Sequence, residues 1–293
     1  GATWVDSCPE DADGDGFMFS EDCDDTRDFL YPYDDDIDGT YDGCGWRDLS
    51  LNHGLTCGLT SNKEILCWGN TTSVSPPYGQ WEEIGQGGSC ALDANQNFEC
   101  WFSSDTYGEQ SDVPQTANAL SEEDGTPCTI QTDGTLYCWG RNHCGQTNTP
   151  SGLFTQVSGA QWSACGIRDN GTLECWPSGG CTNYGQYSPP SGTYTKLSAG
   201  GAHLCAIRDS GSLACWGRNN VNQSNPPSNT FIDVSVGGDA MAISCGIISS
   251  GSITCWAGPD SLLNNIPNGS NYVDIECGRS NHCCAIRNSG SME

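Results

Sequence analysis

The sequence has few basic residues and no long apolar run. Its 293 residues contain 10 Lys and Arg against 37 Asp and Glu, so the formal net charge is −27. A chain this acidic repels phosphate backbones, which argues against a nucleic-acid partner. No apolar stretch approaches the roughly 18 residues that cross a bilayer, so we expect no direct insertion into a membrane. The charge instead favours divalent cations as ligands.

The sequence also lacks the apolar content of one large core, because hydrophobic residues make up only 35% of it. It is rich in cysteine, with 20 residues, which reducing conditions inside a cell would keep as thiols. The first residues, Gly1 to Trp4, have neither the basic nor the apolar region of a signal peptide. We therefore expect a mature, exported chain that is extracellular or on the cell surface, its signal peptide already removed.

The sequence contains no pattern that singles out a catalytic nucleophile. There is no Gly-x-Ser-x-Gly elbow, and the four histidines, His53, His143, His203 and His282, are dispersed along the chain. We predict packing roles for the histidines, no catalytic residues and no enzyme activity. A lyase or glycosidase is the least favoured alternative, since it requires paired carboxylates in a central channel, which the sequence alone does not place.

Acidic residues are concentrated at the start of the chain. Residues 1–45 hold 15 of the 37 acids and a single base, Arg27, with almost no apolar periodicity. Such a segment cannot bury enough surface to order itself without disulfides or a bound cation. We therefore predict two domains, an Asp-rich segment over residues 1–45 and a repeat domain over residues 46–293.

The acidic segment has the spacing of a calcium loop. The first run, which includes Gly16 for the turn, fits D-x-[DN]-x-[DN]-G-x5-E with Asp at the last position, and a second run repeats the spacing through its ninth position. The expected ligands are Asp11, Asp13, Asp15, the Phe17 carbonyl and Asp22, followed by Asp34, Asp36, Asp38 and Asp42. Hard carboxylates without a histidine in residues 1–52 favour Ca²⁺ over copper. The alternative is a solvated acidic tail without metal.

Together with Cys23, Asp24 and Pro32, these runs resemble the Asp-rich calcium repeats of thrombospondin type 3 and the MopE-like motif of bacterial surface proteins. The resemblance implies calcium binding by Asp11, Asp13, Asp15, Asp22, Asp24, Asp36, Asp38 and Asp42. Ile37 stands where the bacterial motif usually has cysteine, so the disulfide pattern of that motif is not expected here.

A repeat fills the rest of the chain. Six times it shows a cysteine, nine residues, a second cysteine and an aromatic residue, and within each copy apolar residues alternate around a turn such as Asp169-Asn170-Gly171. This pattern predicts a β-hairpin in which the two cysteines face each other at about 4.5–5.5 Å between Cβ atoms, close to what a disulfide needs. The predicted pairs are Cys57/Cys67, Cys90/Cys100, Cys128/Cys138, Cys165/Cys175, Cys205/Cys215 and Cys245/Cys255.

Other cysteines lie outside these hairpins. Cys144 and Cys181 each follow a hairpin's second cysteine by six residues, so we expect them to join neighbouring loops. Near the end of the chain, a zinc site from Cys277, His282, Cys283 and Cys284 is an alternative to disulfides, which an oxidising compartment favours.

Each hairpin is preceded by a further strand that opens with an aromatic residue, and several are followed by a polar loop with Gln and Pro. Units of three or four short strands, repeated about seven times without helical periodicity, predict an all-β, seven-bladed β-propeller with one disulfide in each hairpin. The opening aromatics are Trp46, Trp81, Phe154, Tyr194, Phe231 and Tyr272, and the loops contain Gln146, Gln186 and Gln223.

The run from Gly200-Gly201-Ala202-His203-Leu204-Cys205-Ala206-Ile207 to Cys215-Trp216-Gly217-Arg218-Asn219 resembles the regulator-of-chromosome-condensation repeat, in the secreted bacterial form of the β-lactamase-inhibitor protein II type. The resemblance covers residues 46–293 and implies the propeller fold. Propellers of this kind serve as exchange factors, inhibitors and adhesins, so the resemblance leaves the function open. The paired cysteines depart from the nuclear members. The acidic, exported character of the chain argues against guanine-nucleotide exchange.

The seventh copy is incomplete, since it starts at Cys284 and ends at Glu293, one residue before the expected Cys-Trp. Either the natural chain continues, or another segment, such as Tyr41 to Cys44 or part of a neighbouring molecule, completes the last blade.

We predict a calcium-stabilised, non-enzymatic binding or structural protein of the cell surface. Its partner would be a protein or a surface glycan, held by loops with aromatic residues such as Tyr107, Tyr184 and Tyr187. A filament that joins copies through the N-terminal segment and the open seventh blade is a variant of this function. An enzyme inhibitor of the β-lactamase-inhibitor protein II kind is the main alternative.

Overall fold

A computed structural model describes residues 45–51, 55–69, 76, 78–85, 90–101, 117, 119–123, 126–159, 162–176, 181–238, 242–258, 263–278 and 282–292. These residues form twenty short strands in seven antiparallel sheets, six with three strands and one with two. Each sheet takes its strands in chain order. No helix among the described residues is long and apolar enough to cross a membrane.

The strands are short, at three to seven residues each. The first three sheets contain β1 (Trp46–Leu51), β2 (Leu55–Thr60) and β3 (Ile65–Gly69); β4 (Trp81–Ile84), β5 (Cys90–Asp93) and β6 (Phe98–Cys100); and β7 (Ala119–Glu123), β8 (Thr126–Ile130) and β9 (Leu136–Cys138). The next two contain β10 (Phe154–Gly159), β11 (Ala164–Arg168) and β12 (Leu173–Trp176), then β13 (Tyr194–Ala199), β14 (His203–Arg208) and β15 (Leu213–Gly217). The last two contain β16 (Phe231–Gly237), β17 (Ile243–Ile248) and β18 (Ile253–Ala257), then β19 (Tyr272–Cys277) and β20 (Cys283–Arg287).

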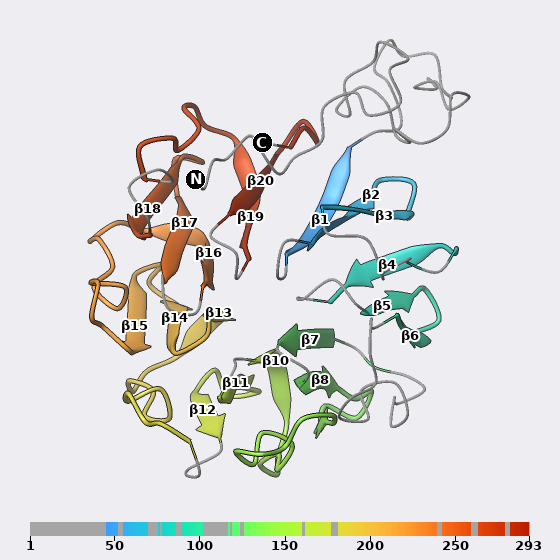
Figure 1. The fold of residues 1–293 in the computed structure, drawn as a ribbon, viewed down its shortest axis with the longest axis vertical. Helices are drawn as coiled ribbons and strands as arrows, with labels where there is room; N and C mark the ends of the chain where they lie inside the picture. Colours follow the sequence, from blue (N-terminus) through green and yellow to red (C-terminus); the bar gives the residue numbers. More distant parts are fainter. Residues whose placement is uncertain are drawn as a thin grey trace.

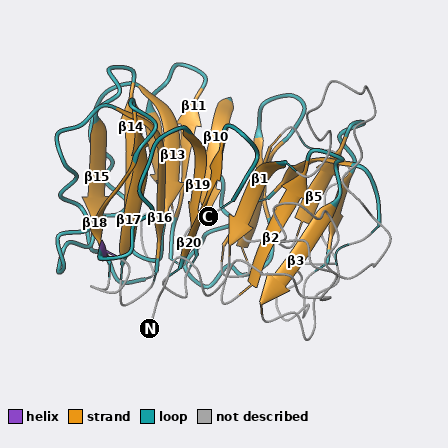
Figure 2. Cartoon of the chain, turned by 90° about the horizontal axis from the view of Figure 1, so that it is seen from above, coloured by secondary structure: helices purple, strands orange, loops and turns teal. Residues whose placement is uncertain are grey.

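The sheets follow one another around a common centre, and the first strand of each sheet lies nearest to that centre (Figure 1). In the view turned by 90°, the strands of successive sheets stand side by side (Figure 2). The inner strand β10 contacts β7 and β13, β16 contacts β13 and β19, and β1 contacts β4. Strand β1 also contacts β19 and β20, so the first sheet packs against the last.

The same backbone hydrogen bond joins each sheet to the next. A turn residue in the left-handed region closes every hairpin, as at Gly171 with a φ of 82°. Its carbonyl accepts a hydrogen bond from the backbone N–H of the first residue of the next inner strand, or, in the third sheet, from Ala117 just before that strand. The seven N–H donors and their acceptors are Trp81 with Lys63, Ala117 with Gln96, Phe154 with Gly134, Tyr194 with Gly171, Phe231 with Gly211, Tyr272 with Gly251, and Trp46 with Gly290, at 2.8–3.2 Å. The last of these links the seventh sheet to the first.

The hairpin register brings the paired cysteines opposite each other, as the alternating pattern predicts. Disulfides join Cys57 to Cys67, Cys90 to Cys100, Cys128 to Cys138, Cys165 to Cys175, Cys205 to Cys215 and Cys245 to Cys255, with Cα atoms 4.0–4.1 Å apart. The seventh sheet has a different arrangement, because its disulfide joins Cys277 of β19 to Cys283 of β20. This bond uses two of the four residues that the zinc alternative requires.

The apolar cores lie between neighbouring sheets. In one of them, Cys165 and Ile167 of β11 pack against Tyr194 and Leu197 of β13. At the junction of the first and last sheets, Trp46, Leu49 and Leu51 pack with Cys284 and Ile286. Several small cores of this kind explain how a chain with so few apolar residues folds.

Serine side chains connect the inner strands to one another. The Ser158 hydroxyl accepts the backbone N–H of Ala199 at 3.1 Å, and the Ser198 hydroxyl accepts that of Val236 at 3.0 Å. The Ser121 and Ser235 hydroxyls do the same for Gly159 and Cys277. These bonds fix the spacing of the strands around the centre.

Candidate functional site

Six inner strands have a register shift after their first residue. The shift falls between Tyr194 and Lys196 in β13, for example, and recurs at the same place in β1, β4, β10, β16 and β19. A bulge of this kind turns the side chain that follows it in a new direction. The residues that follow the six shifts are Asp48, Glu83, Gln156, Lys196, Asp233 and Asp274.

Charged residues from five sheets interact at the centre. We call Asp48, Glu83, Lys196, Asp233, Asp274 and Glu276 the central acidic cluster. The Lys196 ammonium forms an ion pair with Asp233, and the charges of Asp48, Asp233, Asp274 and Glu276 act on one another. The Lys196 side chain is 37% exposed and that of Asp233 only 4%.

Most residues after a register shift have hydrogen-bond partners. Asp48 Oδ1 accepts the backbone N–H of Leu49 at 3.0 Å, and Asp233 Oδ1 accepts that of Val234 at 2.6 Å. Gln156 bonds both the N–H and the carbonyl of Leu197 in the next sheet, each at 2.9 Å.

Glu276 lies two residues further along β19, and its Oε2 accepts from the Ser235 hydroxyl at 2.9 Å. Asp274 differs from all of these, because its Oδ2 is buried and has no hydrogen-bond partner among the described residues.

Burial dominates the protonation of the cluster. It raises the pKa of Asp48 to about 7, with a contribution from the Glu83 charge, and raises that of Glu276 to about 7. Burial and the Asp233 charge raise the pKa of Asp274 well above its usual value. Burial would lower the pKa of Lys196, but Asp233, Asp274 and Glu276 outweigh it and the pKa is raised. The lysine therefore stays charged while part of the carboxylate charge is neutralised by protons.

The two buried histidines make contacts between sheets. His203 Nε2 lies 2.9 Å from Ser244 Oγ, and His282 Nε2 lies 3.2 Å from Thr56 Oγ1. Thr56 holds the repeat position in the first sheet that Ser244 holds in the sixth. His203 is 1% exposed and Ser244 is fully buried, so no substrate reaches this pair. The pattern fits the packing role that the sequence predicts for these histidines.

Three loops after the hairpins are held by a buried glutamine. Gln186, for example, accepts the N–H of Tyr184 through its side chain, while its own carbonyl accepts the indole N–H of Trp216 at 2.9 Å. Gln146 makes the equivalent bonds with Cys144 and Trp176, and Gln223 makes them with Val221 and Trp256. All three glutamines are at most 1% exposed. The loops are thus fixed from within.

An exposed tyrosine lies on the loop that Gln186 holds, next to a tryptophan from the connection between β10 and β11. The ring of Tyr184, which is 41% exposed, stacks on Trp162 with centroids 6.1 Å apart, and the Arg218 guanidinium lies 5.4 Å from the Tyr184 ring centre. The Tyr187 hydroxyl donates to the Trp162 carbonyl at 3.0 Å. We call Trp162, Tyr184, Tyr187 and Arg218 the loop surface.

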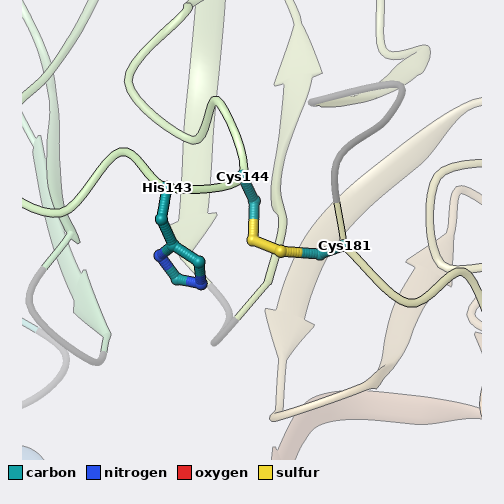
Figure 3. Close-up of side chains that lie close together, drawn as sticks. All are labelled: His143, Cys144 and Cys181. Carbon is teal, nitrogen blue, oxygen red and sulfur yellow. A yellow bond between two sulfur atoms is a disulfide. The ribbon is translucent and has the colours of Figure 1, made fainter.

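The disulfide between Cys144 and Cys181 joins two neighbouring loops beside His143 (Figure 3). These three residues form one of two groups of potential metal ligands in the described part of the chain, and the other consists of Cys245, Cys277 and Cys283. All five cysteines are in disulfides, so neither group offers the thiolates that zinc requires. The Nδ1 atom of His143 accepts from Arg141 instead, at 2.9 Å.

Comparisons with known proteins agree with this geometry. Residues 130–146 and 194–223 match the model of the regulator of chromosome condensation (RCC1) repeat, whereas no curated protein sequence matches the chain. The ectodomain of the Physcomitrella patens receptor kinase CR4 superposes with a TM-score of 0.70 at 23% identity, over 86% of this chain and 72% of that one. The CRINKLY WD40 ectodomain of the Arabidopsis thaliana receptor kinase ACR4 gives 0.66 at 20% identity, over 85% and 93%. Yeast RCC1 (Prp20), in a structure with Kap60 bound, gives 0.64 at 13% identity, over 83% and 80%.

The fold is a β-propeller with RCC1-type repeats. At these identities the likeness establishes the fold, and the function must be argued from the propeller's own residues.

The structure places some of the predicted site residues and not others. The six hairpin disulfides and the Cys144–Cys181 disulfide join the predicted pairs, and Tyr184 and Tyr187 lie together on the loop surface. The predicted calcium ligands in residues 1–44 and the predicted contact residue Tyr107 lie outside the described residues.

The central acidic cluster is the part of the propeller that the sequence analysis missed. A signal was present, because each clustered residue except Glu276 stands two positions after an opening aromatic and directly before an aliphatic residue, as in Tyr272-Val273-Asp274-Ile275. The aromatic and the aliphatic residue identify the strand, and the polar residue between them is the one that faces the centre.

Proposed function

We propose that the propeller is an exported, non-enzymatic protein that binds a protein or surface-glycan partner through its loop surface. The observation that carries this proposal is the exposed ring of Tyr184, which stacks on the half-buried Trp162 beside the half-buried Arg218, on a loop that Gln186 holds from within. Tyrosine, tryptophan and arginine supply most of the binding energy at interfaces, and a fixed loop loses little entropy on binding.

The disulfides support the exported location. Eight of them hold the described part of the propeller together, and bonds of this kind persist in oxidising compartments. Two of the structures with a similar fold are ectodomains of plant receptor kinases, which is in keeping with this location.

Differential capture tests the loop surface. Wild-type protein and the variant Tyr184→Ala are immobilised and exposed to material from the surface of the producing cells and their neighbours. We expect Tyr184→Ala to weaken binding of the captured partner about 30-fold, the effect of a hot-spot side chain worth ~2 kcal/mol. The matched control is Tyr78→Ala, since Tyr78 is an exposed tyrosine between the first and second sheets. Equal capture of the partner by wild type and Tyr184→Ala would count against the loop surface. Capture of a single enzyme in a stoichiometric complex would favour the alternative function, an enzyme inhibitor.

We also propose that residues 1–45 bind Ca²⁺ through Asp11, Asp13, Asp15, Phe17, Asp22, Asp24, Asp34, Asp36, Asp38 and Asp42. The support is the loop spacing in the sequence and the preference of Ca²⁺ for several carboxylate and carbonyl oxygens. Calorimetry should detect Ca²⁺ binding by this segment. We expect Asp13→Asn to weaken this binding, and we expect copper not to replace the bound Ca²⁺. If copies join into filaments through this segment, chelation should dissolve them in the electron microscope, and unchanged filaments would remove calcium from that assembly.

We further propose that the seven sheets form a closed, seven-bladed ring. The contacts of Trp46 with Gly290 and of Thr56 with His282 repeat those between internal neighbours and support this arrangement. Thr56→Val should then cost about as much unfolding free energy as Ser244→Ala, roughly 1 kcal/mol for one hydrogen bond. A Thr56→Val variant as stable as wild type would argue for an open ring.

A further inference from the structure

Three consecutive loops contain no acidic residue, although the chain as a whole is strongly acidic. They follow the third strands β9, β12 and β15, and we call residues 140–152, 177–192 and 218–229 the acid-free loops. All 22 acids of residues 46–293 lie outside them, and the loops that come before and after these three in the chain both contain Asp. Their only Lys or Arg residues are Arg141 and Arg218, so their formal charge is +2 in a chain of −27.

Direct contacts connect the three acid-free loops. The disulfide between Cys144 and Cys181 joins the first loop to the second (Figure 3). The Arg218 guanidinium of the third loop lies 5.4 Å from the ring centre of Tyr184 in the second. The lack of acids is therefore a property of one continuous surface across three sheets, and the loop surface lies within it.

The Arg218 guanidinium is the one basic group among the described residues that has neither a hydrogen bond nor an ion pair. Arg208 is the nearest comparison, since it also lies over a tyrosine ring but donates to the Ser191 carbonyl at 2.9 Å. Arg218 is half-buried, and no described residue accepts from its five N–H donors. The seven bases with a side-chain partner are Arg47, Lys63, Arg141, Arg168, Lys196, Arg208 and Arg287.

The chemistry of this group favours a carboxylate on a protein. A guanidinium donates two parallel hydrogen bonds to a carboxylate, and its contact with the Tyr184 ring fixes the direction of these donors. Protein interfaces are rich in Tyr, Trp and Arg and poor in Asp and Glu, which is the composition found here. A long acidic polymer is disfavoured, because beyond these loops it would meet the acidic remainder of the chain.

We propose that Arg218 binds an Asp or Glu side chain of a protein partner in a two-bonded ion pair beside Tyr184. This inference rests on the proposed function, because it assigns the chemistry of the partner at the loop surface. The partner carries few other acids around that carboxylate, since the acidic residues outside these loops repel them.

Selection from a phage-displayed library of random peptides on the immobilised whole protein tests the ion pair. We expect the peptides that Tyr184→Ala weakens to share an Asp or Glu. Replacing that residue by Asn or Gln in a synthetic copy should weaken binding to wild type about 10- to 100-fold, the effect of a hydrogen-bonded charge. The same replacement should have little effect on binding to Arg218→Gln, because the partner of the carboxylate is then absent.

The variants isolate the missing charge from a loss of structure. Arg218→Gln removes no hydrogen bond among the described residues, so the variant should fold. The matched control is Lys63→Gln, which removes the same charge from the first sheet, where the ammonium is paired with Glu82. Lys63→Gln should bind each peptide like wild type.

The outcomes separate this proposal from the proposed function. Peptides that depend on Tyr184 but share no acid would overturn the ion pair and leave the loop surface intact, as would an equal effect of the amide replacement on wild type and Arg218→Gln. A selection without any peptide that depends on Tyr184 would overturn both. Binding of an oligogalacturonate that Arg218→Gln abolishes, in place of peptide binding, would overturn the protein partner in favour of an acidic glycan.

Discussion

His203 should make the stability of the propeller depend on pH. The side chain is 1% exposed and bonded to Ser244, and burial lowers its pKa from 6.5 to about 4. The unfolded chain therefore takes up a proton on this imidazole below pH 6.5, whereas the folded propeller stays neutral there until about pH 4. Stability is complete above pH 6.5 and is lost as the pH falls towards 4.

The size of the effect follows from the difference between the two pKa values. At about 1.4 kcal/mol for each pKa unit, His203 contributes roughly 3 kcal/mol over the whole range, of which about 2 kcal/mol is lost between pH 7.5 and pH 5. The buried acids work in the opposite direction. The pKa of Asp48, Asp274 and Glu276 is raised on folding, so these groups stabilise the propeller as the pH falls through their folded pKa. Only a comparison of variants isolates the histidine.

Denaturant unfolding of wild type and His203→Gln at pH 7.5, 6.5, 5.5 and 5 provides this comparison. The glutamine amide reaches the place of Nε2 and keeps a hydrogen bond to Ser244, but it does not titrate. We expect the free-energy difference between the two proteins to shift by about 2 kcal/mol in favour of the variant between pH 7.5 and pH 5. The buried acids and His282 are present in both proteins, so their contributions to the pH dependence cancel in the free-energy difference. A difference that stays constant over this range would refute the buried neutral state of His203.

Two further predictions concern the backbone and the disulfides. Gly217→Ala should destabilise the propeller by at least about 2 kcal/mol in denaturant unfolding, because φ is +93° and the added Cβ would lie 2.5 Å from the Ala202 carbonyl. Gly185→Ala, with φ at +95° and open space around it, should cost only about 1 kcal/mol, and equal losses would contradict the steric argument. Replacing both Cys205 and Cys215 by alanine should cost about 3 kcal/mol by the chain-entropy estimate for a short loop, and an unchanged unfolding midpoint would show that this disulfide does not stabilise the fold.

The sequence was sufficient for the local part of the fold. In each hairpin the alternation of side chains, the turn residue and the cysteine spacing all require the same register, so Cys165 had to face Cys175 and Ile167 had to face Leu173. The opening aromatics likewise mark the inner strands, as Tyr194 does for β13. These features depend on residues close together in the chain.

The sequence repeats the polar position that forms the central acidic cluster, but it does not show that these residues meet. The register shift after the first residue of each inner strand interrupts the two-residue alternation, so the pattern does not say that Lys196 and Asp274 face the same way. Their proximity also depends on how successive sheets turn about the centre, which no single repeat encodes. The Cys277–Cys283 disulfide was left open because it joins an inner strand to its neighbour, unlike the hairpin pairs.

The bond between Trp46 and Gly290 has a consequence for the order of folding. The six equivalent bonds join residues near each other in the chain, whereas this one spans almost the whole described chain. Closing so long a loop costs about 2 kcal/mol more in chain entropy than closing one of the short ones. The six local junctions should therefore form first and this seam last, and the same seam should open first when the protein unfolds. Amide hydrogens along β1 and β20 should accordingly exchange with solvent sooner than those of the sheets that contain β10 to β15.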